Sequence, residues 1–165
     1  MNNFKKAVFF DRDGVLNKEK KNYVKTIEEL EIFPNIIEPI KKLTNYGFVI
    51  IVITNQSAIN RGFTTHKNVD EIHLILQNYL KQNGTKIDGF YYCPHIPDEN
   101  CICRKPKPGL FFKAADEFKL NLELSWMIGD NDTDIQAAIS AGCKAIKIST
   151  NNDLQHSVEQ ILNSQ

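Results

Sequence analysis

The chain has 165 residues, of which 42% are hydrophobic and 24% charged, and this fits one globular domain over residues 1–165. Its 20 Lys and Arg balance its 20 Asp and Glu, which argues against a broad nucleic-acid-binding surface. The first apolar run, residues 7–10, is too short for a signal sequence, and no apolar stretch reaches the roughly 20 residues of a membrane span. We therefore expect a cytoplasmic monomer without nucleic-acid or membrane partners.

Short apolar segments alternate with amphipathic segments along the chain. The expected elements, in order, are a strand at 7–10, a helix at 36–46, a strand at 48–53, a helix at 66–82, a strand at 89–93, a helix at 108–118, a strand at 126–128, a helix at 133–141, a strand at 145–148 and a helix at about 153–163. Asn35 is expected to cap the first helix, and Gly47 to end it. This alternation predicts an α/β fold with a doubly wound parallel sheet, in which ligands bind beyond the carboxyl ends of the strands.

Carboxylates follow two of the expected strands. Asp11 and Asp13 come directly after the first strand, and they point the same way if the strand geometry persists. Such a pair repels itself unless a cation is present, and Mg²⁺ prefers oxygen ligands. Asp130, after the fourth strand, would add an oxygen, and Asp134 would steady the metal shell from behind. The alternatives are that Asp11 and Asp13 only cap the strand and start a turn, and that the segment after the fourth strand serves to cap the helix beginning at 133 through Asn131 or Asp132.

Two further residues would serve a phosphoryl group at the same edge. Thr54, after the second strand, offers a hydroxyl, and Lys105 offers a positive charge. Phosphoryl transfer is catalysed mostly by positioning and charge neutralisation, so a hydroxyl, a cationic side chain and Mg²⁺ suffice. The alternatives are a plain strand-to-loop transition at Thr54 and an exposed loop lysine at 105.

Four motifs in order resemble those of the haloacid-dehalogenase phosphatases. They are D-R-D-G-V at 11–15, I-T-N at 53–55, R-K-P-K-P-G at 104–109 and G-D-N-D-T-D at 129–134. Together they cover nearly the whole chain, and they imply that family's Rossmann-like core without a large cap.

The resemblance also implies the role of each motif residue. Asp11 would form an aspartyl-phosphate, and Asp13 would protonate the leaving alcohol and then activate water. Thr54 and Lys105 would hold the phosphoryl group, with Lys107 as the rival for the motif lysine. Mg²⁺ would be bound by Asp11, Asp130 and the backbone carbonyl of Asp13.

Three of the four cysteines lie within eleven residues, beside a histidine. Cys93, His95, Cys101 and Cys103 supply three thiolates and an imidazole, which make a closed tetrahedral zinc site of structural type. In a reducing compartment this pattern favours a metal over a disulfide. The alternative is reduced, unconnected cysteines beside a surface histidine. Cys143 lies outside the cluster, and we expect it in the core.

The zinc loop resembles that of two subgroups, the heptose-bisphosphate phosphatases and the related histidinol-phosphate phosphatases. T-N-Q-S-A-I-N-R-G at 54–62 is similar to the first, whereas the short gap between His95 and Cys101 is closer to the second. The resemblance implies Mg²⁺-dependent removal of the 7-phosphate of D-glycero-D-manno-heptose 1,7-bisphosphate, with histidinol phosphate as the alternative substrate. The residues expected to bind substrate are Arg12, Asn55, Gln56, Ser57, Arg61 and Arg104.

Other functions remain open from the sequence alone. A polynucleotide 3′-phosphatase is built on a similar core, although the zero net charge and the zinc loop argue against it. An inactive zinc-stabilised binding module is the alternative outside the enzymes, and the acids at 11, 13 and 130 weigh against it. Lys18, Lys20 and Lys21 either steer a phosphorylated substrate or form a solvated face.

Overall fold

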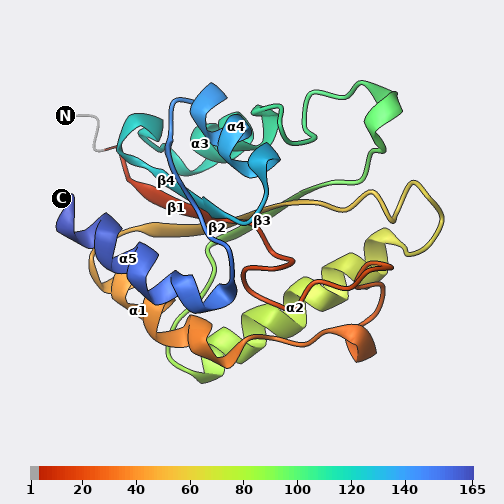
Figure 1. Cartoon of the computed structure of the whole chain (residues 1–165), viewed down its shortest axis with the longest axis horizontal. Coiled ribbons are helices and arrows are strands. Elements are labelled where there is room, and N and C mark those ends of the chain that lie inside the picture. Colours follow the sequence, from red (N-terminus) through yellow and green to blue (C-terminus); the bar gives the residue numbers. More distant parts are fainter. Residues whose placement is uncertain (1–3) are drawn as a thin grey trace.

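The computed structural model describes residues 4–165, which form one parallel sheet flanked by helices (Figure 1). The strands are β1 (Ala7–Phe10), β2 (Val49–Asn55), β3 (Gly89–Cys93), β4 (Trp126–Gly129) and β5 (Lys144–Lys147). Their order across the sheet is β3-β2-β1-β4-β5, and each neighbouring pair is parallel. The doubly wound sheet predicted from the sequence is therefore confirmed, and β1 occupies its centre.

Helices cover both faces of the sheet. They are α1 (Ile37–Asn45), α2 (His66–Gln82), α3 (Gly109–Phe118), α4 (Asp132–Ser140) and α5 (Leu154–Asn163). Figure 1 shows α1, α2 and α5 on one face and α3 and α4 on the other. Every predicted helix and strand is present, with ends within two residues of the predicted ones. Among residues 4–165, no helix is long and apolar enough to cross a membrane.

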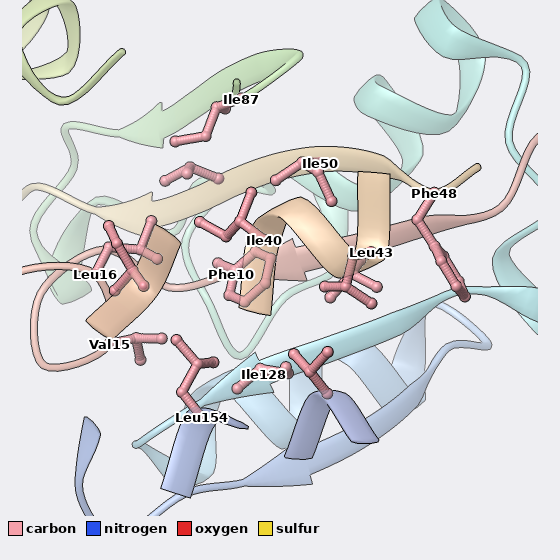
Figure 2. Packing of buried hydrophobic residues seen from close by; sticks show 14 of the residues in the cluster. Phe10, Val15, Leu16, Ile40, Leu43, Phe48, Ile50, Ile87, Ile128 and Leu154 are labelled. Atoms are coloured by element: carbon pink, nitrogen blue, oxygen red, sulfur yellow. The ribbon is translucent and has the colours of Figure 1, made fainter. Parts of the chain in front are cut away.

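Side-chain alternation along β1 divides the core into two layers. Val8 and Phe10 point toward α1 and α5, whereas Ala7 and Phe9 point toward α3 and α4. Figure 2 shows Phe10 among Ile40, Ile50 and Ile128, which come from a helix and two neighbouring strands. Because both faces of β1 are covered, the strand needs apolar residues at every position.

Of the two predictions for the ends of α1, one is confirmed and the other is wrong. Gly47 follows the helix with φ +80°, a left-handed conformation that glycine adopts without a Cβ penalty, so the predicted stop is confirmed. The predicted cap is wrong. Asn35 lies in the 3₁₀ turn Pro34–Ile36, and its amide donates to the Asn151 carbonyl at 3.4 Å. Ile36 therefore precedes the helix without a side-chain cap.

Replacing Phe10 by Ala should lower the free energy of unfolding by about 3–5 kcal/mol, since the ring is fully buried and its loss leaves a cavity. Urea unfolding followed by circular dichroism measures the change. Ile139→Ala, at a 65% exposed position of α4, is the control and should change the free energy by less than about 0.5 kcal/mol. Equal effects of the two variants would contradict the assigned core.

Candidate active site

Polar side chains from several strand ends meet around one cavity of about 300 Å³. Asp11 follows β1 and Thr54 lies at the end of β2, and both line the cavity. Asp130 follows β4, the other neighbour of β1; it does not line the cavity, but its carboxylate lies within 4.8 Å of that of Asp11. The cavity is lined by Asp11, Asp13, Glu19, Lys20, Tyr23, Val24, Thr54, Asn55, Ser57, Arg61, Arg104, Lys105, Asn131, Thr133 and Asp134. The sheet therefore brings most of the predicted site residues to one edge.

Lys105 is the buried cation of this site, with 3% of its surface exposed. Its Nζ lies 3.0 Å from Asp11 Oδ1 and 2.6 Å from Asp134 Oδ1, and it donates to the Ile53 carbonyl at 2.8 Å. Burial alone would lower the pKa of the ammonium, but the two carboxylates outweigh burial and raise it, so Lys105 stays charged. Lys107, the rival lysine, instead donates to the Cys101 carbonyl at 2.7 Å on the exposed side of the loop.

The acids outnumber the buried cations. Asp11, Asp130 and Asp134 each present a ligand atom, and these atoms lie within 4.8 Å of one another. Burial raises the pKa of Asp11, Lys105 opposes the rise and the neighbouring carboxylates add to it, which leaves the pKa at about 7. Burial and then Asp134 raise the pKa of Asp130 as well. Counting Asp13, four carboxylates face the cations of Arg12 and Lys105, so a divalent cation would restore neutrality.

Backbone geometry brings Asp130 close to the end of β1. Gly14 has φ +85°, and a Cβ at this residue would lie 2.3 Å from Asp130 Oδ2. Asp134 is equally constrained, because a Cβ at Gly129 would lie 2.4 Å from its carboxylate. Asn131 N–H donates to Asp134 Oδ2 at 3.1 Å at the start of α4. The positions of both acids therefore require glycine at residues 14 and 129, where a side chain would collide with them.

The Asp13 carboxylate has several hydrogen-bond donors of its own. It accepts hydrogen bonds from Asn17 at 2.9 Å, Gln56 at 2.9 Å and the Arg12 guanidinium at 3.0 Å. Burial raises the pKa of Asp13, but Arg12 and then the two amides outweigh it and hold the pKa below its usual value. Asp13 lines the cavity as a carboxylate that is oriented by its neighbours.

Two predicted substrate-binding residues, Arg12 and Gln56, do not line the cavity. The Arg12 side chain is completely buried beneath Asp13. Gln56 is 2% exposed, and its amide donates to both Asp13 and Thr54 at 2.9 Å. Their polar groups are used inside the protein, and this corrects the prediction that they contact substrate.

The other four predicted substrate-binding residues lie on the cavity wall. Asn55 also holds the backbone of Lys105, accepting from its N–H at 3.0 Å and donating to its carbonyl at 3.1 Å. Arg61 is exposed, and Ser57 is buried at the base of the same loop. Arg104 is half-buried and donates to the His95 carbonyl at 3.2 Å, so it is tied to the cysteine loop.

Some cavity residues were not predicted. Glu19 and Tyr23 come from the loop after β1, and Thr133 comes from the first turn of α4. Tyr23 has φ +65°, uncommon for a residue with a side chain, and its ring lies 6.0 Å from that of Phe63. No motif marks this loop. Of the lysine run, Lys20 lines the cavity, and both Lys18 and Lys20 form ion pairs with Glu31.

The four predicted zinc ligands lie together at the end of β3. Cys93 Sγ is 3.6 Å from Cys101 Sγ and 3.0 Å from Cys103 Sγ, and His95 Nδ1 is 3.2 Å from Cys103 Sγ. Sulfurs around a tetrahedral zinc ion are about 3.8 Å apart, so these residues fit that ion with small adjustments. Cys143 is buried in the α3/α4 layer of the core, as predicted.

Similarity to known proteins agrees with this geometry. A family model described as HAD-hydrolase-like matches residues 102–164. A D-glycero-beta-D-manno-heptose-1,7-bisphosphate 7-phosphatase of Helicobacter pylori is 43% identical over 91% of this chain and 86% of its own. A D-glycero-alpha-D-manno-heptose-1,7-bisphosphate 7-phosphatase from Photorhabdus laumondii is 38% identical over 83% of this chain and 78% of its own. The chain belongs to this family of HAD-like phosphatases.

A solved structure supports the same family assignment. A D,D-heptose 1,7-bisphosphate phosphatase from B. bronchiseptica, crystallised with magnesium and phosphate, superposes with a TM-score of 0.90. It is 31% identical, and the match covers 97% of this chain and 99% of that one. The protein is therefore a phosphoric monoester hydrolase on a HAD-like core.

Replacing Gly14 by Ala should weaken Mg²⁺ binding by about tenfold or more, because the new methyl group would displace Asp130. Isothermal titration calorimetry with MgCl₂ measures the affinity. Gly62→Ala is the matched control, since Gly62 has φ +77° but no atom within 4 Å of the position that a methyl group would take. Both variants should lose about 1 kcal/mol of stability from backbone strain. Equal Mg²⁺ affinities in the two variants would contradict the role of the Gly14–Asp130 contact.

Proposed function

We propose that this chain removes the 7-phosphate of D-glycero-D-manno-heptose 1,7-bisphosphate in a Mg²⁺-dependent reaction. The observation that carries the proposal is the 43% identity to a phosphatase of that name over 91% of the chain. The polar cavity supports it independently, because Lys105, Arg61 and Arg104 all line it together with the acids. A bisphosphate carries several negative charges, and these cationic side chains offset them.

The first proposed step transfers the phosphoryl group to Asp11. A carboxylate oxygen of Asp11 attacks phosphorus, the bond from phosphorus to the sugar oxygen breaks, and Asp13, which enters this step protonated, gives its proton to that oxygen. The transfer leaves Asp13 as the carboxylate that its hydrogen bonds favour. Thr54 and Lys105 hold the non-bridging phosphoryl oxygens during the transfer. Support for Asp11 as nucleophile comes from its place in the cavity lining, with Oδ1 3.0 Å from the Lys105 ammonium.

The second proposed step hydrolyses the aspartyl-phosphate. Asp13 removes a proton from water, the resulting hydroxide attacks phosphorus, and the bond from phosphorus to the Asp11 oxygen breaks. Inorganic phosphate leaves, Asp11 returns to a carboxylate and Asp13 carries a proton for the next cycle. The hydrogen bonds to Asp13 support this use, since they fix the carboxylate at the cavity wall.

Mg²⁺ would be held by the carboxylates of Asp11 and Asp130 and by the backbone carbonyl of Asp13. When bound, Mg²⁺ supplies positive charge that offsets the crowded acids and the phosphoryl oxygens. The excess of carboxylates over buried cations supports this assignment, as does their spacing within 4.8 Å. Asp134, paired with Lys105 and bonded by Asn131 N–H, would hold the neighbouring side chains in place.

Zinc would be held by Cys93, His95, Cys101 and Cys103 as a structural ion. The loop between β3 and α3 has one short 3₁₀ turn, Pro97–Glu99, and no longer helix or strand. The Arg104 N–H donates to Cys101 Sγ at 3.3 Å, and Lys105 comes next in the chain. Binding zinc would therefore fix the loop that carries Arg104 and Lys105 to the cavity. We further propose that the chain acts as a single-domain monomer on a small phosphorylated sugar.

Substrate preference and the nucleophile can be tested in one assay. Phosphate release with MgCl₂ should be fastest from heptose 1,7-bisphosphate, tested as both anomers, and slower from histidinol phosphate or a 3′-phosphorylated oligonucleotide. Asp11→Asn should lower kcat by at least about a thousandfold, because the amide is not a nucleophile. Asp116→Asn, at an exposed position of α3, is the control. No Mg²⁺-dependent release from any of these phosphoesters would refute the proposed enzyme activity, and an active Asp11→Asn variant would refute the mechanism.

Protein purified without chelator should contain about one zinc ion per chain by inductively coupled plasma mass spectrometry. Cys101→Ser should lower the zinc content, the melting temperature and the activity together, because the loop to Lys105 loses its anchor. Cys143→Ser, which alters the buried cysteine outside the cluster, should keep its zinc. Zinc-free protein with full activity would contradict the zinc assignment.

A further inference from the structure

The fully buried Arg12 side chain lies between two groups that are far apart in sequence. Its Nη2 lies 3.0 Å from both carboxylate oxygens of Asp13, and its Nε lies 3.2 Å from Oδ1. Its Nη1 lies 3.3 Å from Nε2 of His73, which comes from α2. Arg12 therefore connects a helix on the outer layer to the acid at the cavity wall.

The chemistry of this contact fixes the state of His73. A guanidinium has only donors, so the Nε2 atom that faces it must accept with its lone pair. His73 is then a neutral imidazole with its proton on Nδ1. Burial, and then the charge of Arg12, lower the pKa of His73 to about 3, which agrees with a neutral ring.

Aromatic rings hold the His73 imidazole in place. The Phe90 ring is stacked on it with centroids 4.6 Å apart, and the Tyr92 ring meets it edge-on at 5.7 Å. Phe90 and Tyr92 both belong to β3, which lies across β2 from β1. The ring orientation is thus set by the edge of the sheet and not by the active-site loops.

A buried ion pair contributes little net stability. The free energy needed to desolvate both groups is about as large as that gained from their attraction, and an apolar pair of similar volume is often as stable. Here the charged pair ends on a carboxylate that lines the cavity, and the Arg12 side chain itself has no exposure. Its position suits a residue that orients Asp13, for which a planar, bidentate guanidinium is well adapted.

We propose that His73 is a positioning residue, which acts on the acid/base Asp13 by fixing the Arg12 guanidinium in its bidentate orientation. The inference rests on the proposed role of Asp13 in hydrolysis. Without the acceptor at 73, Arg12 can rotate toward other partners, and Asp13 loses the orientation needed to deliver a proton to the leaving oxygen and to take one from water. The effect falls on proton transfer and not on substrate binding.

The test compares three variants at or near this position. His73→Leu removes the acceptor at similar size, and His73→Gln keeps an acceptor oxygen. Leu76→Ala truncates a buried apolar side chain of the same helix, which has no polar atom to accept from Arg12. His73→Leu should lower kcat on heptose bisphosphate by about ten- to a hundredfold with little change in KM, because a small misplacement of a reacting group has that effect. His73→Gln should restore most of kcat. Leu76→Ala should lose stability and keep kcat.

A second substrate separates positioning from general destabilisation. Nitrophenolate leaves without a proton, so p-nitrophenyl phosphate needs Asp13 only for hydrolysis of the aspartyl-phosphate. Stopped-flow measurement on His73→Leu should show a burst of nitrophenol followed by slow turnover. Three results would overturn the inference: equal kcat losses in His73→Leu and Leu76→Ala, a wild-type kcat in His73→Leu, or no burst. The proposed function would still stand in each case, provided that the wild-type chain is active. A wild-type chain without any phosphatase activity would overturn the proposed function itself.

Nitrogen-15 NMR of the histidine side chains gives a readout independent of turnover. The chain has four histidines, and the signals missing from His73→Gln assign residue 73. The expected spectrum shows a neutral ring protonated on Nδ1, with Nε2 shifted as a hydrogen-bond acceptor. A proton on Nε2 would overturn the inference, because that nitrogen could not then accept from Arg12.

Discussion

The structure of this site depends on one buried ammonium group. Lys105 Nζ lies between the carboxylates of Asp11 and Asp134 and the carbonyl of Ile53, with almost no exposure to solvent. A charge in such a place is tolerated only if its partners are close and well oriented. Asp11 follows β1, Asp134 lies in the first turn of α4, and the lysine comes from a loop. The sheet, the loop and the first turn of α4 must therefore all be correctly placed before this centre can form.

The loop that delivers Lys105 is fixed at several points because it has little regular structure. Asn55 binds the Lys105 backbone through two hydrogen bonds, and the cysteine cluster lies directly before Arg104. The neighbouring loops are also joined to one another. The Asn60 amide donates hydrogen bonds to both oxygens of the Glu99 carboxylate at 2.9 and 3.0 Å, and the Thr64 hydroxyl donates to the Lys25 carbonyl at 2.6 Å. Mutual bonding of this kind lets short loops form a defined cavity wall without a separate cap domain.

The polar residues form two layers with different tasks. One layer faces the cavity and includes Asp11, Asp13 and Lys105. Beneath it, buried polar groups such as Arg12 and Gln56 use their hydrogen bonds to hold the first layer. Because a buried carboxylate with several donors has few alternative orientations, the second layer limits the movement of the groups proposed to react. The division also separates the residues at the strand ends, where the proposed chemistry takes place, from the loop residues on the wall, which are proposed to bind the substrate.

The sequence by itself determined the order and type of every helix and strand, the doubly wound sheet, the family and the gathering of Asp11, Thr54 and Asp130 at one edge. It could do so because apolar runs and residues directly after strands have fixed consequences in a parallel sheet. Only the tertiary structure decided the rest. It distinguished Lys105 from Lys107 and turned Arg12 and Gln56 inward. It also brought Glu19 and Tyr23 to the cavity and His73 into contact with Arg12. Those outcomes depend on side-chain direction and on contacts between residues far apart in the chain, such as the 61 positions from Arg12 to His73, which no local pattern encodes.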